Sequence, residues 1–284
     1  MELVRSIPAV RNLIKQIKKQ GLSIGFVPTM GALHEGHLSL INTSKNSNDF
    51  TVVSIFVNPI QFGKNEDFDK YPRMIESDMQ KMQTISPDIV FAPDKSEIIG
   101  NNLLSFLDIE KLGDTLCGSK RPGHFRGVCT IVSKLFNIIE PDRAYFGKKD
   151  IQQYMILKKM AIDLNFDIEV IGCEIIREKD GLAMSSRNLY LSKEEREQAL
   201  ILNLSLKKAS ELYNKGIRDT NTIKEQVIAM IKTKPLTLID YVSIVDKNMQ
   251  EIDVINEGDI IALAVYLGKT RLIDNYIFGE TINY

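Results

Sequence analysis

The amino-acid sequence predicts an α/β protein in which a parallel sheet carries helices on both faces and is followed by a smaller α+β domain. In the first half of the chain, short apolar runs rich in Val, Ile and Phe alternate with stretches of helical character. These runs are apolar almost throughout, as expected for strands that are buried on both faces of a parallel sheet. Beyond about residue 176 the alternation stops, and two helical stretches precede three strand-like runs. This order is typical of a Rossmann-like domain with a separate α+β domain behind it.

The individual elements are expected where runs of one character are bounded by Gly, Pro, Asn or Asp. In the first half, strands are expected at 22–27, 50–57, 89–92, 144–146 and 168–171, and helices at 7–20, from 36 onward, at 127–139 and at 150–164. A polar loop is expected at 177–188. Behind it, Ser192 is expected to cap a long charged helix, and the remaining elements are a helix at 222–232 and strands at 238–245, 259–267 and 271–277. We therefore place a domain boundary at residue 176, which divides the chain into 1–176 and 177–284.

The composition excludes several classes of protein. The 284 residues carry a net charge of -1 and a pI of about 6.4, so no global basic field points to nucleic acid as a partner. The apolar runs are only as long as a strand, and we expect no membrane partner. The three cysteines, Cys117, Cys129 and Cys173, lack the spacing of a zinc site or a disulfide framework and fit a reducing compartment. A cytoplasmic protein is therefore expected.

Two histidines lie behind the first expected strand, at the start of a helix. His34 and His37 share one face of the first turn, and the chain has only three histidines in all. Imidazoles beside the N–H groups of a helix N-terminus can donate hydrogen bonds to a phosphate, and Gly36 lets a ligand approach the backbone. A metal site would need a third ligand, and neither a GxGxxG nor a Walker loop is present. We interpret this turn as a phosphate-binding site, with a loop of incidental histidines as the alternative.

Two further segments hold polar groups that could bind a substrate. Gln61 follows Asn58-Pro59 at the end of an expected strand and offers both a donor and an acceptor. Asn-Pro is also a common turn, so this segment is weak by itself. The segment 121–127 holds the third histidine and two arginines, and a solvated loop explains it equally well.

Two segments could contact a triphosphate. At 146–153 a strand ends in glycine, and paired lysines could neutralise charge on a transferring phosphate. Asp150 and Gln153 also have the spacing of a capping box, which is a structural explanation for both. The loop at 180–188 contains two serines and an arginine and could close over phosphates, or it could simply link the domains.

Taken together, these segments resemble a known family. His-x-Gly-His at 34–37 and Met-Ser-Ser-Arg at 184–187 are similar to the signatures of the adenylate-forming nucleotidyltransferase superfamily, which includes the class I aminoacyl-tRNA synthetases. The match is closer to the pantothenate synthetases (pantoate–β-alanine ligases). Five segments resemble that family in its order and at its spacing, namely 27–37, 54–62, 71–73, 121–127 and 180–188, and the resemblance continues to 271–275.

The resemblance implies a two-step ligation. Pantoate attacks the α-phosphate of ATP to give pantoyl adenylate and pyrophosphate, and the amine of β-alanine then displaces AMP to give pantothenate. No covalent enzyme intermediate is expected, so catalysis would depend on positioning and charge stabilisation. The resemblance also implies Mg²⁺, a homodimer formed through the N-terminal domain, and a C-terminal domain that acts as a lid.

The resemblance assigns roles to particular residues. Catalytic roles fall to His34, His37 (as proton donor), Lys149, Ser185, Ser186 and Arg187. The residues implied in ATP binding are Met30, Gly31, His34, His37, Gly147, Lys148, Lys149, Asp150, Ile176, Met184, Ser185, Ser186 and Arg187. Gln61 and Gln153 are implied in pantoate binding, and Asp78 in Mg²⁺ binding. One position departs from the family, because Lys148 stands where many relatives have Glu or Gln.

Three alternatives compete with this hypothesis. A nucleotidyltransferase of the same superfamily would move AMP onto a phosphorylated substrate, but the paired glutamines favour a small hydroxy acid. A non-catalytic RNA-binding relative of the tRNA synthetases is disfavoured by the neutral net charge and by the lack of an anticodon-binding extension. A purely structural scaffold leaves the clustered histidines and glycines unexplained.

Overall fold

The computed structural model describes residues 1–63, 66 and 68–282, and its chain divides into two compact units. The N-terminal unit comprises Met1–Lys148 and Gln153–Cys173, and the C-terminal unit comprises Lys149–Gln152 and Glu174–Tyr284. The second unit therefore begins close to residue 176 but also takes in the short segment that contains Lys149.

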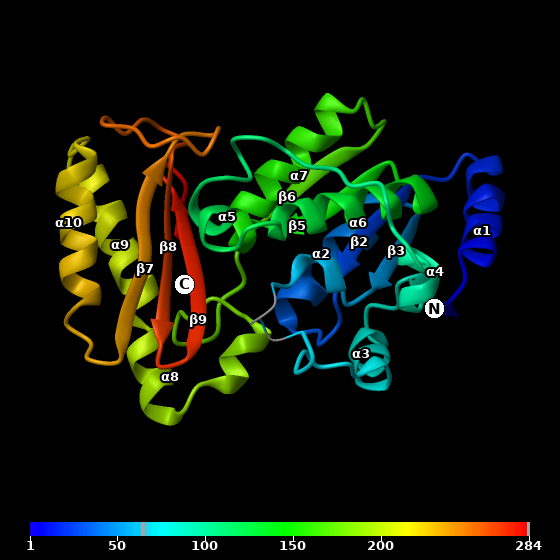
Figure 1. The fold of residues 1–284 in the computed structure, drawn as a ribbon, viewed down its shortest axis with the longest axis horizontal. Coiled ribbons are helices and arrows are strands. Elements are labelled where there is room, and N and C mark those ends of the chain that lie inside the picture. The colour runs from blue at the N-terminus through cyan, green and yellow to red at the C-terminus, as the bar shows by residue number, and fades with distance from the viewer. Residues whose placement is uncertain (64–65, 67, 283–284) are drawn as a thin grey trace. The chain divides into compact units, whose positions relative to one another are not determined.

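A six-stranded parallel sheet forms the centre of the N-terminal unit (Figure 1). Its strands are β1 (Glu2–Val4), β2 (Ile24–Thr29), β3 (Phe50–Ile55), β4 (Ile89–Phe91), β5 (Arg143–Gly147) and β6 (Glu169–Cys173), in the order β1-β4-β3-β2-β5-β6. The strand order reverses between β2 and β5. In open α/β sheets this switch point is where ligands bind, outside the carboxyl ends of the strands.

Helices cover both faces of this sheet, which confirms the predicted fold class. Val27, Val53 and Tyr145 pack in one cluster with Leu40 and Ile41 of α2 (Glu35–Ser47). Because side chains alternate along a strand, Phe26 points to the opposite face. There its ring lies 6.4 Å from that of Phe136, which belongs to α6 (His124–Ile139). The other helices of this unit are α1 (Ile7–Lys19), α3 (Ile75–Met82), α4 (Lys95–Ile99), α5 (Leu116–Lys120) and most of α7 (Ile151–Asp163), with the 3-10 turn η1 (Pro59–Gln61). A second 3-10 turn, η2 (Lys148–Asp150), begins at the last residue of this unit's first segment and continues into the C-terminal unit.

The C-terminal unit is the predicted α+β arrangement. Its antiparallel sheet has the order β7-β8-β9, with β7 (Thr237–Val245), β8 (Ile260–Leu267) and β9 (Thr270–Ile277). Figure 1 shows α9 (Ile201–Asn214) and α10 (Thr220–Ile231) beside this sheet, and their buried side chains form one core with it. Ser192 and Glu195 form a capping box at the start of α8 (Lys193–Ala199), as the sequence predicts. The single long helix expected there is divided at Leu200 into α8 and α9.

None of the helices formed by the described residues has the length and hydropathy that a bilayer crossing requires.

Candidate active site

The histidine turn follows β2 and starts α2. Its backbone is left-handed at Gly31 (φ 82°) and Ala32 (φ 51°), and His34 is the N-cap residue. The Gly36 N–H donates to His34 Nδ1 (3.1 Å), and the His34 N–H donates to His37 Nδ1 (3.3 Å). Because both Nδ1 atoms accept, the neutral rings carry their protons on Nε2. Two Nε2–H donors at a helix N-terminus suit a phosphate ligand, as the sequence predicts.

Asp78 of α3 holds this turn in shape. It is only 1% exposed, and its two carboxylate oxygens accept hydrogen bonds from the Ala32 N–H (2.9 Å) and the Leu33 N–H (2.8 Å). A Cβ at Gly31 would lie 3.0 Å from Asp78 Oδ2, so the glycine is required by space as well as by φ. Asp78 as a Mg²⁺ ligand stays a prediction. The described residues contain no group of three His, Cys, Asp or Glu side chains suited to a metal ion.

We expect Asp78→Asn to destabilise the protein by about 1–3 kcal/mol, because an amide N–H would face one of the two backbone donors that Asp78 now satisfies. The same change should disturb the histidine turn and weaken ATP binding. Urea unfolding measures the first effect and nucleotide titration the second. The exposed Asp69→Asn is the matched control. An unchanged unfolding midpoint for Asp78→Asn would contradict the proposed packing of the turn.

Gln61, predicted to hold substrate, is fixed through its side chain. Asn58 Nδ2 donates to Gln61 Oε1 (2.9 Å) and to the Gly127 carbonyl (3.1 Å), and Gln61 Nε2 lies 3.1 Å from the sulfur of Met30. Two predicted site residues, Met30 and Gln61, are thus brought into contact. Asn58 is buried (3% exposed) and was missed as a site residue, because the Asn-Pro pair was interpreted only as a turn.

The segment 121–127, for which a solvated loop was the alternative, leads into α6, which begins at His124, and it is exposed at Pro122, Gly123 and Arg126 but buried at His124, Phe125 and Gly127. Arg121 makes two hydrogen bonds of 2.6 Å to the carboxylate of Glu66 and one of 3.0 Å to His124 Nε2. His124 Nδ1 lies 2.8 Å from the Gln61 carbonyl oxygen. Burial alone would raise the pKa of Glu66, but the hydrogen bonds and charge of Arg121 outweigh it and hold that pKa below its ordinary value.

This lowered pKa has a consequence for stability. Below the unfolded-state pKa of Glu66, and as the pH falls through its folded-state value, the carboxylate takes up a proton and the ion pair with Arg121 is lost. We expect Glu66→Gln to lower stability at neutral pH and to flatten the acid side of the stability curve. Chemical denaturation at several pH values tests this. Coincident curves for the two proteins would show that the pair contributes nothing to stability.

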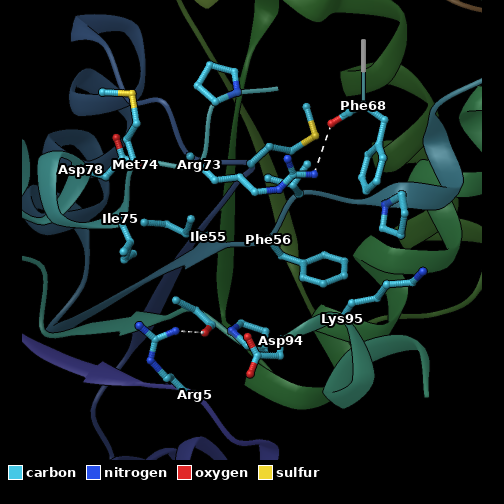
Figure 2. A pocket seen from close by; sticks show the side chains of 17 residues that line it. Arg5, Ile55, Phe56, Phe68, Arg73, Met74, Ile75, Asp78, Asp94 and Lys95 are labelled. Atoms are coloured by element: carbon cyan, nitrogen blue, oxygen red, sulfur yellow. Dashed lines mark hydrogen bonds between the residues drawn. The ribbon is translucent and has the colours of Figure 1, made fainter. Parts of the chain in front are cut away.

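A pocket of about 370 Å³ opens at the carboxyl ends of β3 and β4 (Figure 2). Its lining includes Met30, Gly31 and Asp78 among the predicted site residues. Figure 2 shows Arg73 extending across it, where Nη2 donates to the Phe68 carbonyl (3.2 Å). The guanidinium also lies 5.0 Å from the centre of the Phe68 ring. Arg73 therefore holds its own segment in place, which gives the Tyr71-Pro72-Arg73 motif a structural role.

The lysine segment lies at the end of β5. Lys149 Nζ is 3.9 Å from Asp150 Oδ2, and within the C-terminal unit Asn275 Nδ2 donates to the Lys149 carbonyl (2.9 Å). A Cβ added at Gly147 would meet no atom within 4 Å, which leaves room for a ligand beside the backbone. Gln153, the second predicted pantoate residue, lies in the first turn of α7, and its role beside Gln61 stays a prediction.

The loop with Met184, Ser185, Ser186 and Arg187 is ordered by its own contacts. The Met184 N–H donates to the Ile176 carbonyl (2.9 Å), and the Arg187 N–H donates to Ser185 Oγ (3.3 Å).

Hydrogen bonds and ion pairs fix the two ends of this loop. Asn188 Nδ2 donates to Glu178 (2.7 Å), and Arg196 bonds Glu178 (2.8 Å) and Asp180 (2.9 Å). Burial tends to raise the pKa of Asp180, but the hydrogen bonds and charge of Arg196 lower it. The loop therefore has a defined shape within the C-terminal unit.

A six-stranded parallel sheet whose strand β2 leads into a turn with two histidines at a helix N-terminus is typical of nucleotide-binding α/β enzymes. A family model described as "Pantoate-beta-alanine ligase" matches residues 2–277. The chain belongs to the pantoate-beta-alanine ligase family, and it is a ligase that forms a C–N bond.

Pantothenate synthetases of other organisms are similar to this chain over nearly its whole length. A curated pantothenate synthetase from Clostridium botulinum (strain ATCC 19397 / Type A) is 52% identical over 279 residues, which cover 98% of this chain and 99% of that protein. The crystal structure of pantothenate synthetase from Thermus thermophilus has a TM-score of 0.93 at 37% identity, with 98% and 99% covered. A Francisella tularensis pantoate-beta-alanine ligase, solved as a complex with "Beta-gamma ATP and Beta-alanine", has a TM-score of 0.80 at 33% identity, with both chains fully covered.

Proposed function

We propose that this chain joins pantoate to β-alanine with the free energy of ATP. A carboxylate oxygen of pantoate attacks the α-phosphorus of ATP, and the bond to the β-phosphate breaks to release pyrophosphate. The amine of β-alanine then attacks the acyl carbon of pantoyl adenylate, AMP leaves, and pantothenate is formed. The observation that carries this proposal is the turn that contains His34 and His37. Both rings accept a backbone N–H at Nδ1, which leaves two Nε2–H donors at the N-terminus of α2.

The proposed roles follow from what each group can donate. His34 and His37 hold phosphate oxygens, with His37 as proton donor, and Lys149 stabilises charge on the phosphates. Ser185, Ser186 and Arg187 are proposed to close over the triphosphate, with the C-terminal residues from 177 acting as a lid. Met30, Gly31, Gly147, Lys148, Asp150, Ile176 and Met184 complete the proposed ATP site. Gln61 and Gln153 are proposed to bind pantoate.

We propose that Mg²⁺ enters with ATP as part of the substrate. The metal would neutralise charge on the departing pyrophosphate. Asp78, the one residue implied as a ligand, already accepts two backbone hydrogen bonds. The donor set therefore fits a metal carried by the phosphates better than a resident metal site.

We also propose a cytoplasmic homodimer. In the N-terminal unit, Leu104 (81% exposed) and Phe106 (45% exposed) lie on a segment outside the named helices and strands, and such apolar exposure suits an interface between two copies. Sedimentation velocity of wild type and Leu104→Asp tests the dimer.

The cysteines agree with the proposed cytoplasmic location. Burial raises the pKa of the Cys129 thiol to about 12, so this thiol is expected to be inert in a reducing compartment.

The first experiment is a coupled assay for AMP with ATP, Mg²⁺, pantoate and β-alanine, in which one component is omitted at a time. AMP that requires both organic substrates, with pantothenate confirmed by mass, would establish the ligase. AMP formation without pantoate would instead favour the alternative nucleotidyltransferase.

A further inference from the structure

We propose that His124 is a positioning residue for Gln61, and that Arg121 and Glu66 hold His124 in the one neutral tautomer that this role requires. The segment 121–127 is otherwise given no part in the proposed function. The kinetic part of the inference rests on that function, whereas its structural part does not.

The tautomer follows from the partners of the ring. An arginine side chain has only hydrogen-bond donors, so His124 Nε2, 3.0 Å from Arg121 Nη1, must accept. The ring proton therefore lies on Nδ1. From there it is donated to the Gln61 carbonyl oxygen, 2.8 Å away.

Arg121 is itself fixed by Glu66. Its Nε and Nη2 atoms each lie 2.6 Å from one carboxylate oxygen, a two-point contact that sets the plane of the guanidinium. This leaves Nη1 directed at His124. The charged groups that face this site are Glu66 and Arg121, and the thiol of Cys117 also interacts with Arg121. A doubly protonated His124 would place an N–H against a guanidinium N–H, so the network selects the neutral ring.

Gln61 is therefore fixed both at its backbone carbonyl and at its side-chain amide. His124 binds its carbonyl oxygen, while Asn58 (2.9 Å) and Met30 (3.1 Å) bind its side-chain amide. Close packing of α6 against η1 supports the same arrangement, because a Cβ at Gly127 would lie 2.3 Å from the Ile60 carbonyl oxygen. Rotation of the Gln61 backbone would turn its amide away from the substrate.

The three histidines provide a direct test. His34 and His37 accept at Nδ1 and so carry the proton on Nε2, whereas His124 is expected to carry it on Nδ1. Ring-nitrogen NMR of the ¹⁵N-labelled full chain at neutral pH should therefore show one Nδ1–H ring and two Nε2–H rings. Through-bond assignment identifies each ring without any variant. A His124 ring protonated on Nε2, alone or on both nitrogens, would overturn the proposal.

Two substitutions separate positioning from general stability. In His124→Asn the amide nitrogen can occupy the place of Nδ1, and in His124→Gln it can occupy only that of Nε2. We expect His124→Gln to raise KM for pantoate roughly tenfold, the scale of a lost hydrogen bond, with KM for ATP nearly unchanged. His124→Asn should keep most of the pantoate affinity.

Equal effects of both variants on pantoate and ATP, or no rescue by Asn in a folded protein, would overturn the positioning role. If the wild type makes no pantothenate, the proposed function fails, and the NMR result still decides the tautomer. If neither variant folds, the NMR result alone decides the inference.

Discussion

Lys149→Ala is expected to slow the formation of pantoyl adenylate by on the order of 10²-fold or more, the usual scale for removing one donor that stabilises transition-state charge. The lysine lies just beyond the carboxyl end of β5, and its side chain is 19% exposed. Asn275 anchors its carbonyl (2.9 Å), so its position depends on contacts that the substitution leaves intact. The fold should therefore survive while the chemistry fails.

The measurement is pantoate-dependent release of pyrophosphate in the absence of β-alanine, which isolates the first step. Lys148→Ala is the matched control, because it removes the same charge one residue earlier. We expect it to change KM for ATP more than the rate of adenylation. Near-normal pyrophosphate release from Lys149→Ala would remove the assignment of this lysine.

The elements that could be predicted from the sequence are those whose own residues show a clear pattern. Strands such as β2 and β3 are continuous apolar runs, and their burial on both faces makes that run necessary. Short elements carry no such signal. The three residues of β1 form a strand only because β4 pairs with them, and the five-residue helices α4 and α5 are too short to show a helical period.

The candidate site divides in the same way. The spacing of His34 and His37 predicts a shared face, but not that each would accept a backbone N–H from the same turn. The contacts of Arg121 with Glu66 and of His124 with Gln61 span 55 and 63 residues of sequence. Contacts over such distances depend on the tertiary fold, so inspection of the local sequence could not show that 121–127 supports Gln61.

Breaking the buried ion pair between Arg177 and Asp274 is expected to lower the stability of the C-terminal unit strongly. Two hydrogen bonds of 2.7 and 3.0 Å join them, and the side chains are only 5% and 1% exposed. Asp274 Oδ1 also accepts the N–H of Asn275, the residue that anchors Lys149. We expect Asp274→Ala to destabilise the protein by about 3–5 kcal/mol, because the guanidinium would remain buried without its counter-charge.

Urea unfolding followed by fluorescence and circular dichroism measures this loss. Glu169→Ala is the control, because it breaks a salt bridge on the surface. The side chain of Glu169 is 66% exposed and that of its partner Arg143 is 38% exposed, so the loss of this pair should lower the free energy of unfolding by less than about 1 kcal/mol. A double variant, Arg177→Met with Asp274→Leu, should recover much of the stability, because an apolar pair leaves no charge to be desolvated. If Asp274→Ala costs no more than Glu169→Ala, water reaches Arg177 and the pair is not a buried one. If the single change is severe and the double variant recovers, the loss comes from the unpaired charge and not from the missing contacts.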